Sequence, residues 1–132
     1  MDKCVFVHTN EKQWLGALVA EYSFRRNSRN PDAFEVRFIH TRDHPFLAAK
    51  EGQTFLRGGT TRIWRMDDLQ SFTPLRFLPP KLMNWQGRAV VTDPDVFAVG
   101  DVKEILDRDM GGTCLLYTSD AADESPAVYI SV

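Results

Sequence analysis

Two carboxylates two residues apart form the pattern in this sequence that is best suited to chemistry. Asp93 and Asp95 flank Pro94 and follow an apolar run that ends at Thr92. Carboxylates on one tight turn can converge on a single hard cation, and oxygen ligands suit Mg²⁺ or Mn²⁺. Pro94 restricts the turn and favours an extended Asp93. The alternative is a plain turn in which one Asp caps backbone groups and the other is solvated.

The elements around this turn can be predicted from hydrophobic periodicity. Lys3 to Val7 is expected to form a buried strand, and apolar residues at steps of three and four from Gln13 to Arg26 predict an amphipathic helix. Further strands are expected over 34–39 and 88–92. Strands that alternate with helices indicate an α/β fold with a mostly parallel sheet.

The remaining segments carry weaker signals. Residues 40–61 are expected to be mainly loop, with a helical turn near 46–50, and the first part of 67–77 is expected to be helical. Asp101, with Glu104 three residues later, predicts the start of a last helix. In parallel sheets ligands collect at the carboxyl ends of the strands, which here carry the polar residues 8–11 and 93–95.

Three blocks of the chain resemble a known enzyme family. Residues 88–106 resemble the region around the DxD motif of GT-A glycosyltransferases, above all glycosyltransferase family 8 and its relatives. Residues 71–79 are similar to the segment that ends in Arg and Leu-Pro before the same strand, and residues 5–10 are similar to the first strand and its nucleotide-facing loop. The resemblance covers residues 3–110 and implies a Rossmann-like GT-A sheet flanked by helices.

The resemblance also implies a function and its residues. Asp93 and Asp95 would hold Mn²⁺ or Mg²⁺ against the diphosphate of a nucleotide-sugar donor, with Asp93 also near the ribose or sugar. Thr9 and Asn10 would face the base or ribose, and Arg76 would reach toward the donor sugar or phosphates. The implied reaction moves a hexose from a UDP-sugar or similar donor to an acceptor hydroxyl with retention of configuration. The sequence assigns no catalytic residue.

The end of the chain departs from the family. Residues 114–124 resemble a translated transposase adaptor of the kind used to prepare sequencing libraries. We therefore expect residues 1–113 to be the nucleotide-sugar-binding half of a GT-A domain and residues 114–132 to be an artefactual or disordered tail. The later metal-binding His and the acceptor-binding half of the family would lie beyond residue 113, so a chain truncated there is expected to be inactive alone. Thr92 and Pro94 are also unusual for the family at their positions.

Composition excludes several other classes of protein. The chain has 132 residues, a formal net charge of −2 and two cysteines. A nearly neutral chain gives no electrostatic reason to expect nucleic-acid binding. No apolar run approaches the ~20 residues that span a bilayer, and the N-terminus lacks the layout of a signal peptide. Two distant cysteines form neither a disulfide framework nor a zinc pattern, so we expect a cytoplasmic protein.

Two further patterns, and the function itself, each allow two interpretations from the sequence. His40 and His44 have the spacing of a metal pair on a helix, or are loop histidines. Trp64 with the neighbouring Arg57, Arg62 and Arg65 could stack nucleobases, or the tryptophan belongs to the core. The alternative to a transferase is a non-catalytic α/β binding or interaction domain in which Asp93 and Asp95 only form a turn.

Overall fold

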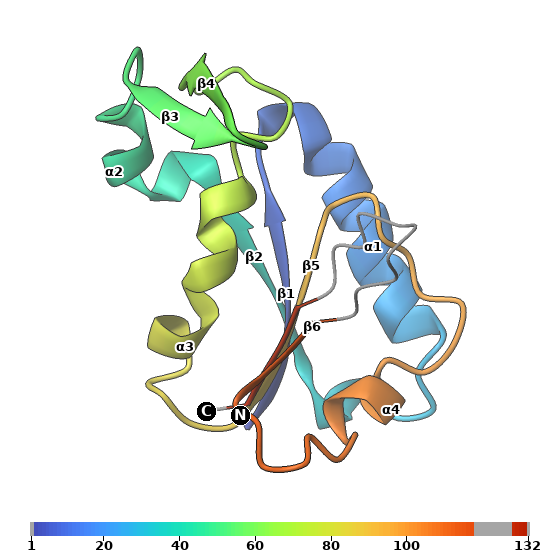
Figure 1. The fold of residues 1–132 in the computed structure, drawn as a ribbon. Coiled ribbons are helices and arrows are strands. Elements are labelled where there is room, and N and C mark those ends of the chain that lie inside the picture. Colours follow the sequence, from blue (N-terminus) through green and yellow to red (C-terminus); the bar gives the residue numbers. More distant parts are fainter. Residues whose placement is uncertain (1, 118–127, 132) are drawn as a thin grey trace.

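The computed structural model describes residues 2–117 and 128–131 and has a five-stranded sheet at its centre (Figure 1). The strand order is β2-β1-β5-β7-β6. The first three strands are parallel, whereas β7 runs antiparallel to β5 and β6 antiparallel to β7. The strands of this sheet are β1 (Lys3–Thr9), β2 (Glu35–His40), β5 (Arg88–Thr92), β6 (Leu115–Tyr117) and β7 (Val128–Ser131).

Helices in the connections from β1 to β2 and from β2 to β5 cover the two faces of the sheet. The α-helices are α1 (Trp14–Arg26), α2 (Pro45–Ala48), α3 (Pro79–Leu82) and α4 (Lys103–Leu106). Short 3-10 helices lie at Glu11–Gln13, Pro31–Ala33, Thr41–Asp43 and Thr73–Phe77, the last of which is η4. The first connection places β2 on one side of β1, and the second places β5 on the other side of β1. The strand order therefore reverses at β1, which is the topology of a doubly wound sheet.

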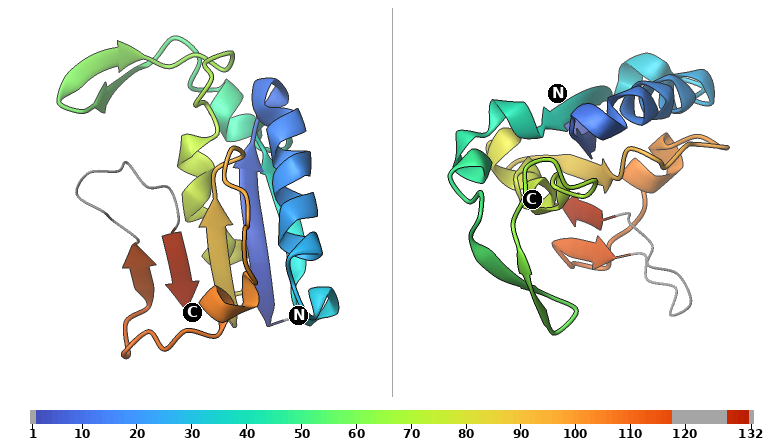
Figure 2. Two further views of the ribbon diagram at one scale, coloured as in Figure 1. Left: turned by 90° about the vertical axis from the view of Figure 1, so that its right-hand side faces the viewer. Right: turned by 90° about the horizontal axis from the view of Figure 1, so that it is seen from above.

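Residues of β1 alternate between two cores. Val5 and Val7 face α1 together with Val90 and the buried face of that helix. Cys4 and Phe6 face the opposite side and pack with residues of α2, η4 and the segment before η4 (Leu47, Trp64, Phe72 and Leu75). This is the period of two expected for a strand buried on both faces. Figure 2 shows α1 lying along one side of the sheet.

A second, two-stranded sheet was not expected from the sequence. Strands β3 (Thr54–Arg57) and β4 (Thr60–Ile63) pair antiparallel around Gly58 and Gly59, both of which have positive φ. Glycine adopts this left-handed conformation without steric cost, as tight hairpin turns require. The prediction of a loop over residues 40–61 was therefore wrong for this hairpin, which projects beyond the main sheet (Figure 2).

The other expected elements agree in most places. Strands β1, β2 and β5, helix α1 and the short α2 lie where periodicity predicted them, within one or two residues. The helix expected at the start of 67–77 is wrong, since residues 67–72 form turns and only Thr73–Phe77 are helical, as a 3-10 helix. The last helix begins one residue later than predicted, since its N-cap is Val102, although Oδ1 of Asp101 still accepts from the amide of Lys103 at 3.0 Å.

The C-terminal segment is described only in part. Residues 115–117 and 128–131 form β6 and β7 and extend the sheet beyond β5. Residues 118–127 lie outside the described residues, so the resemblance of 114–124 to an adaptor stays a prediction. No helix in the described part of the chain is long and apolar enough to cross a membrane.

Candidate functional site

The register between β1 and β5 brings His8 beside Asp93. The ladder pairs Lys3 with Arg88 and ends with Val7 opposite Thr92, so the next residues of the two strands are neighbours. Both side chains point to the face of the sheet that carries η4, because Phe6 and Val91, two residues earlier, belong to the core on that face. The Nε2 atom of His8 forms a hydrogen bond with Oδ1 of Asp93.

His8 is almost completely enclosed. Its side chain is 1% exposed and its ring meets that of Phe72 edge-on, with centroids 4.8 Å apart. The other ring nitrogen, Nδ1, is buried and has no hydrogen-bond partner in the described part of the chain. Asp93 is 23% exposed, so the histidine contacts the carboxylate from the protein side and the carboxylate faces the surface.

Arg76 reaches the same carboxylate from η4. One of its terminal nitrogens lies 4.0 Å from Oδ1 of Asp93, and its Nε donates to the carbonyl of Thr73 at 3.2 Å. The buried Leu75 anchors η4 in the core, which leaves the preceding and following positions nearer the surface. The structure therefore brings together two residues predicted from the sequence, Arg76 and Asp93, and adds His8.

The Asp93-Pro94-Asp95 segment is a turn supported by helix α1. The amide of Val96 donates to the carbonyl of Asp93 at 3.2 Å, which closes the turn with Pro94 at its second position. Gly16 of α1 lies directly beneath, since a Cβ atom there would be only 2.7 Å from the carbonyl oxygen of Pro94. Glycine at position 16 is thus what allows this close approach of helix and turn.

Asp95 lies at the outer corner of the turn. Its side chain is exposed, and it makes no hydrogen bond or ion pair with the rest of the described chain. Because Asp93 precedes and Asp95 follows the same proline, both carboxylates belong to one tight turn at the carboxyl end of β5. The turn thus carries one carboxylate fixed by protein contacts and one that is solvated.

Thr9 and Asn10 lie next to this site but are buried. Asn10 is 3% exposed, and its amide nitrogen donates to Ser71 Oγ at 2.9 Å and to the carbonyls of Asp68 and Leu69 at 3.2 and 3.1 Å. Its Oδ1 accepts from the amide of Gln13 at 3.0 Å. Asn10 therefore fastens the segment before η4 to the end of β1.

A cavity of about 340 Å³ opens at the carboxyl ends of β1 and β2. Its walls include Asn10 and residues that follow the two strands, together with residues 66 and 67; the full lining is Asn10, Glu11, Lys12, Thr41, Arg42, Met66 and Asp67. This volume falls within the ~300–1,000 Å³ of small-molecule sites. Asn10 thus borders both the cavity and the residues that lead into η4.

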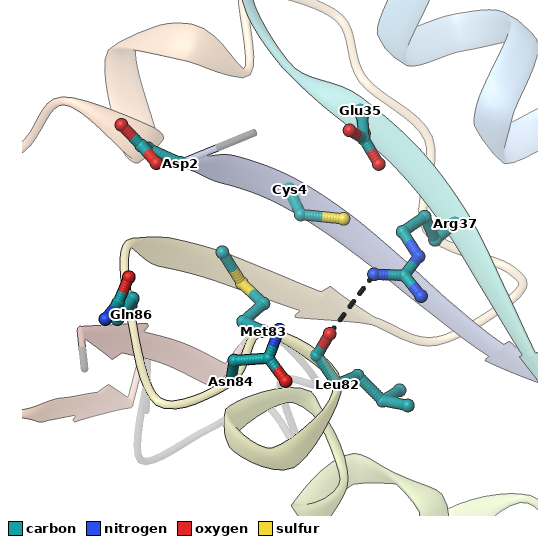
Figure 3. Close-up of a pocket in the computed structure, with 8 residues that line it drawn as sticks. All are labelled: Asp2, Cys4, Glu35, Arg37, Leu82, Met83, Asn84 and Gln86. Carbon is teal, nitrogen blue, oxygen red and sulfur yellow. Dashed lines mark hydrogen bonds between the residues drawn. The ribbon is translucent and has the colours of Figure 1, made fainter.

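A different cavity, of about 260 Å³, lies at the opposite end of the strands (Figure 3). At one end of it Arg37 donates to the carbonyl of Leu82 at 3.3 Å, and Cys4 is among the residues of its wall. Burial raises the pKa of the Cys4 thiol to about 12. None of the residues predicted as ligands lines this cavity, so it is separate from the site around Asp93.

The other sequence candidates acquire structural explanations. His40 is 2% exposed and caps the 3-10 helix that follows β2, since its Nδ1 accepts from the amide of Arg42 at 3.1 Å. His44 precedes α2 and packs on Phe46, so the two histidines do not lie on one helix, as a metal pair with this spacing would require. Trp64 is buried and its indole N–H donates to the carbonyl of Leu47 at 3.1 Å, as the core alternative required.

The donor atoms at the turn suit a hard cation that also binds a ligand. In the described part of the chain, no group of three or more His, Cys, Asp or Glu side chains is arranged to hold a metal by itself. Asp93 and Asp95 supply carboxylate oxygens, and Mg²⁺ is typically held by one or two carboxylates with substrate phosphates completing its shell. The residues therefore fit a divalent ion only as a partner of a phosphate-bearing ligand.

The sequence placed His8 at the polar end of a strand without identifying Asp93 as its partner, and it did not select Gly16. A polar residue at the end of an apolar strand was the available signal for His8. The contact of Gly16 with the turn had no signal in the sequence, because it depends on how α1 crosses the end of β5. Comparison with protein-family models and with curated proteins found no match to this chain.

Proposed function

We propose that this chain binds a nucleotide-sugar donor together with Mg²⁺ or Mn²⁺, as the donor-binding half of a hexosyltransferase. The observation that carries the proposal is the half-buried carboxylate of Asp93 at the carboxyl end of β5, next to β1 and approached by Arg76. Ligands of doubly wound sheets bind where the strand order reverses, and β1 and β5 flank that point here. The sequence resemblance to family 8 supports the same residues.

The chemistry required of the site is stabilisation of a departing diphosphate. Asp93 and Asp95 would hold the ion, which when bound offsets the negative charge of the leaving group. Arg76 adds a fixed positive charge, and a guanidinium pairs well with phosphate oxygens. Its contact with Asp93 keeps that charge beside the turn at 4.0 Å.

The nucleoside part of the donor is proposed to occupy the cavity beyond β1 and β2. This space is bordered by Asn10, Thr41 and Arg42, which offer hydrogen-bonding groups for a ribose or a base. Thr9 is fully buried and its hydroxyl donates to the carbonyl of Asn10 at 3.3 Å. We therefore assign Thr9 the role of shaping the loop, and Asn10 that of bordering the nucleoside.

The proposal is tested by measuring UDP binding calorimetrically with Mn²⁺ and with EDTA. We expect the affinity to fall at least about tenfold without the metal and in the Asp93→Asn/Asp95→Asn double variant. An Asp32→Asn/Asp109→Asn variant removes the same charge from exposed positions and should bind like the original chain. Equal UDP affinity with and without Mn²⁺ would contradict the proposal.

The surface near the hairpin favours a second candidate, an interaction domain. Leu56 and Ile63 are 74% and 52% exposed and border a cavity of about 270 Å³, whose far wall includes Phe77, itself 71% exposed. Exposed apolar residues gathered at one place are typical of protein or ligand contacts. A folded chain that binds no UDP under either condition would support this candidate.

A further inference from the structure

The contact between His8 and Asp93 points to a role that neither the DxD pattern nor the family resemblance assigns. We propose that His8 is a positioning residue, which holds Oδ1 of Asp93 so that the other carboxylate oxygen stays directed to the ligand. This inference rests on the proposed function for the identity of the ligand. The contact itself, between residues 85 positions apart in the chain, does not depend on it.

The Asp93 carboxylate determines which ring nitrogen of His8 acts as the donor in this contact. An ionised carboxylate only accepts hydrogen bonds, so Nε2 must donate to Oδ1 of Asp93. The other ring nitrogen, Nδ1, is buried without a hydrogen-bond partner in the described part of the chain. The imidazole therefore makes one hydrogen bond, and this bond is directed to the candidate site.

A histidine is a costly choice for this position if only the fold matters. The ring is 1% exposed, lies against Phe72 and follows the apolar residues Phe6 and Val7 of β1. An apolar side chain would fill the same space without leaving a buried nitrogen unsatisfied. Local departures from what stability favours concentrate at functional sites, which is the reason to assign His8 to the site.

The contact with His8 fixes the orientation of the Asp93 carboxylate relative to Arg76. Arg76 lies 4.0 Å from the same oxygen, Oδ1, so Asp93 has two positively polarised neighbours on one side. In the described part of the chain, no hydrogen bond reaches the second oxygen, Oδ2. With His8 in place the carboxylate is oriented before a ligand arrives. Without it, the carboxylate is free to rotate into a closer pair with Arg76, and its free oxygen is lost to the ligand.

The first experiment measures affinity and stability together. His8→Met removes the N–H donor at similar size, and His8→Gln keeps an amide N–H near the position of Nε2. We expect His8→Met to weaken Mn²⁺-dependent UDP binding at least about tenfold while its melting temperature stays equal or rises. We expect His8→Gln to restore the affinity to within about threefold of the original chain, since it keeps the donor.

The matched control is His44→Met, which alters a histidine that packs on Phe46 and does not contact Asp93. It should leave UDP affinity unchanged. The proposal is overturned if His8→Met binds like the original chain, or if His8→Gln binds as weakly as His8→Met with both variants folded. A loss of affinity that simply follows a loss of stability in both variants also overturns it.

The second experiment needs no ligand, so it separates this inference from the proposed function. In the chain labelled with ¹⁵N-histidine, nitrogen shifts and proton couplings report which ring nitrogen is protonated, and His8→Gln identifies the His8 signals. We expect Nε2 to carry a proton, and we expect Asp93→Ala to shift its signal and speed its exchange with water. A ring with no proton on Nε2, or a spectrum unaffected by Asp93→Ala, overturns the proposal. Absence of UDP binding by the original chain would instead contradict the proposed function alone.

Discussion

At the scale of the residue, Asn10 joins β1 to the segment that leads into η4. Its side chain makes four hydrogen bonds while 3% exposed. Asn10→Ala removes all four of these hydrogen bonds and leaves the buried hydroxyl of Ser71 without its partner, so we expect the free energy of unfolding to fall by about 2–3 kcal/mol. Urea denaturation measures this. Asn30→Ala is the control, because Asn30 precedes a 3-10 helix without a side-chain cap and should change stability by less than about 0.5 kcal/mol.

His40 makes stability depend on pH. Burial and the nearby charge of Arg42 lower the pKa of His40 below 6.5, against the opposing effects of Glu11 and Asp43. The unfolded chain therefore binds the proton more readily, so stability falls as pH drops below about 6.5 toward the pKa of the folded state. We expect urea denaturation at pH 7.5 and 5.5 to show this loss, bounded by about 1.4 kcal/mol per pH unit. His40→Gln should reduce the loss, and an unchanged pH dependence in that variant would contradict the assignment.

At the scale of the element, helix α1 supports the turn after β5. Replacing glycine by alanine inside a helix usually stabilises it by about 0.5–1 kcal/mol. At Gly16 the added Cβ would lie 2.7 Å from the carbonyl oxygen of Pro94, so helix and turn must separate. We expect Gly16→Ala to cost about 1 kcal/mol in urea denaturation and to weaken Mn²⁺-dependent UDP binding.

Gly100→Ala is the matched control for this prediction. No heavy atom lies within 4 Å of a Cβ at that position, and its φ is not in the left-handed region. It should alter neither stability by more than about 0.5 kcal/mol nor UDP affinity. A Gly16→Ala variant that is more stable than the original chain would show that the turn does not rest on α1.

At the scale of the whole molecule, the thiol of Cys4 reports on the opening of the sheet. Cys4 is 3% exposed on β1, the middle one of the three parallel strands, and burial raises its pKa to about 12, whereas Cys114 is exposed. At pH 8 a thiol reagent should react rapidly with the exposed Cys114, and should react with Cys4 only in molecules whose sheet has opened. In a Cys114→Ser variant we expect labelling of Cys4 at least about a thousandfold slower than in urea. Equally fast labelling in both conditions would mean that β1 is not held in the sheet.

The periodic elements could be predicted from the sequence because their burial is repeated along the chain. Strands β1 and β5 each contain a short apolar run. In α1 the spacing predicted the helix but not its buried face, since Ala17, Ala20 and Phe24 are buried. The larger Leu15, Leu18 and Tyr22 are exposed. The hairpin β3–β4 was missed because nearly all of its residues are exposed, so neither face shows an apolar pattern. Its own signal was the Gly58-Gly59 pair between two short β-prone runs.

Some residues of the candidate site could also be predicted from the sequence, whereas the contact between His8 and Asp93 could not. Asp93 and Asp95 could be proposed from type and spacing, since a turn after a buried strand brings them together by local geometry alone. Arg76 was selected by resemblance, and the structure finds it 4.0 Å from Asp93. His8 was noticed as a polar residue ending a strand, but its partner could not be identified, because a one-residue slip of register would point it to the other face.

The sequence by itself determines which chemical groups are available. These are the two carboxylates of the turn, the polar residues that end β1, and a glycine in α1. The tertiary structure decides which of them meet. His8 and Asp93 are 85 positions apart and become neighbours only through the pairing of Val7 with Thr92. That pairing depends on backbone hydrogen bonds and on two cores filled from both faces of the sheet, which are properties of the assembled chain rather than of any segment of it.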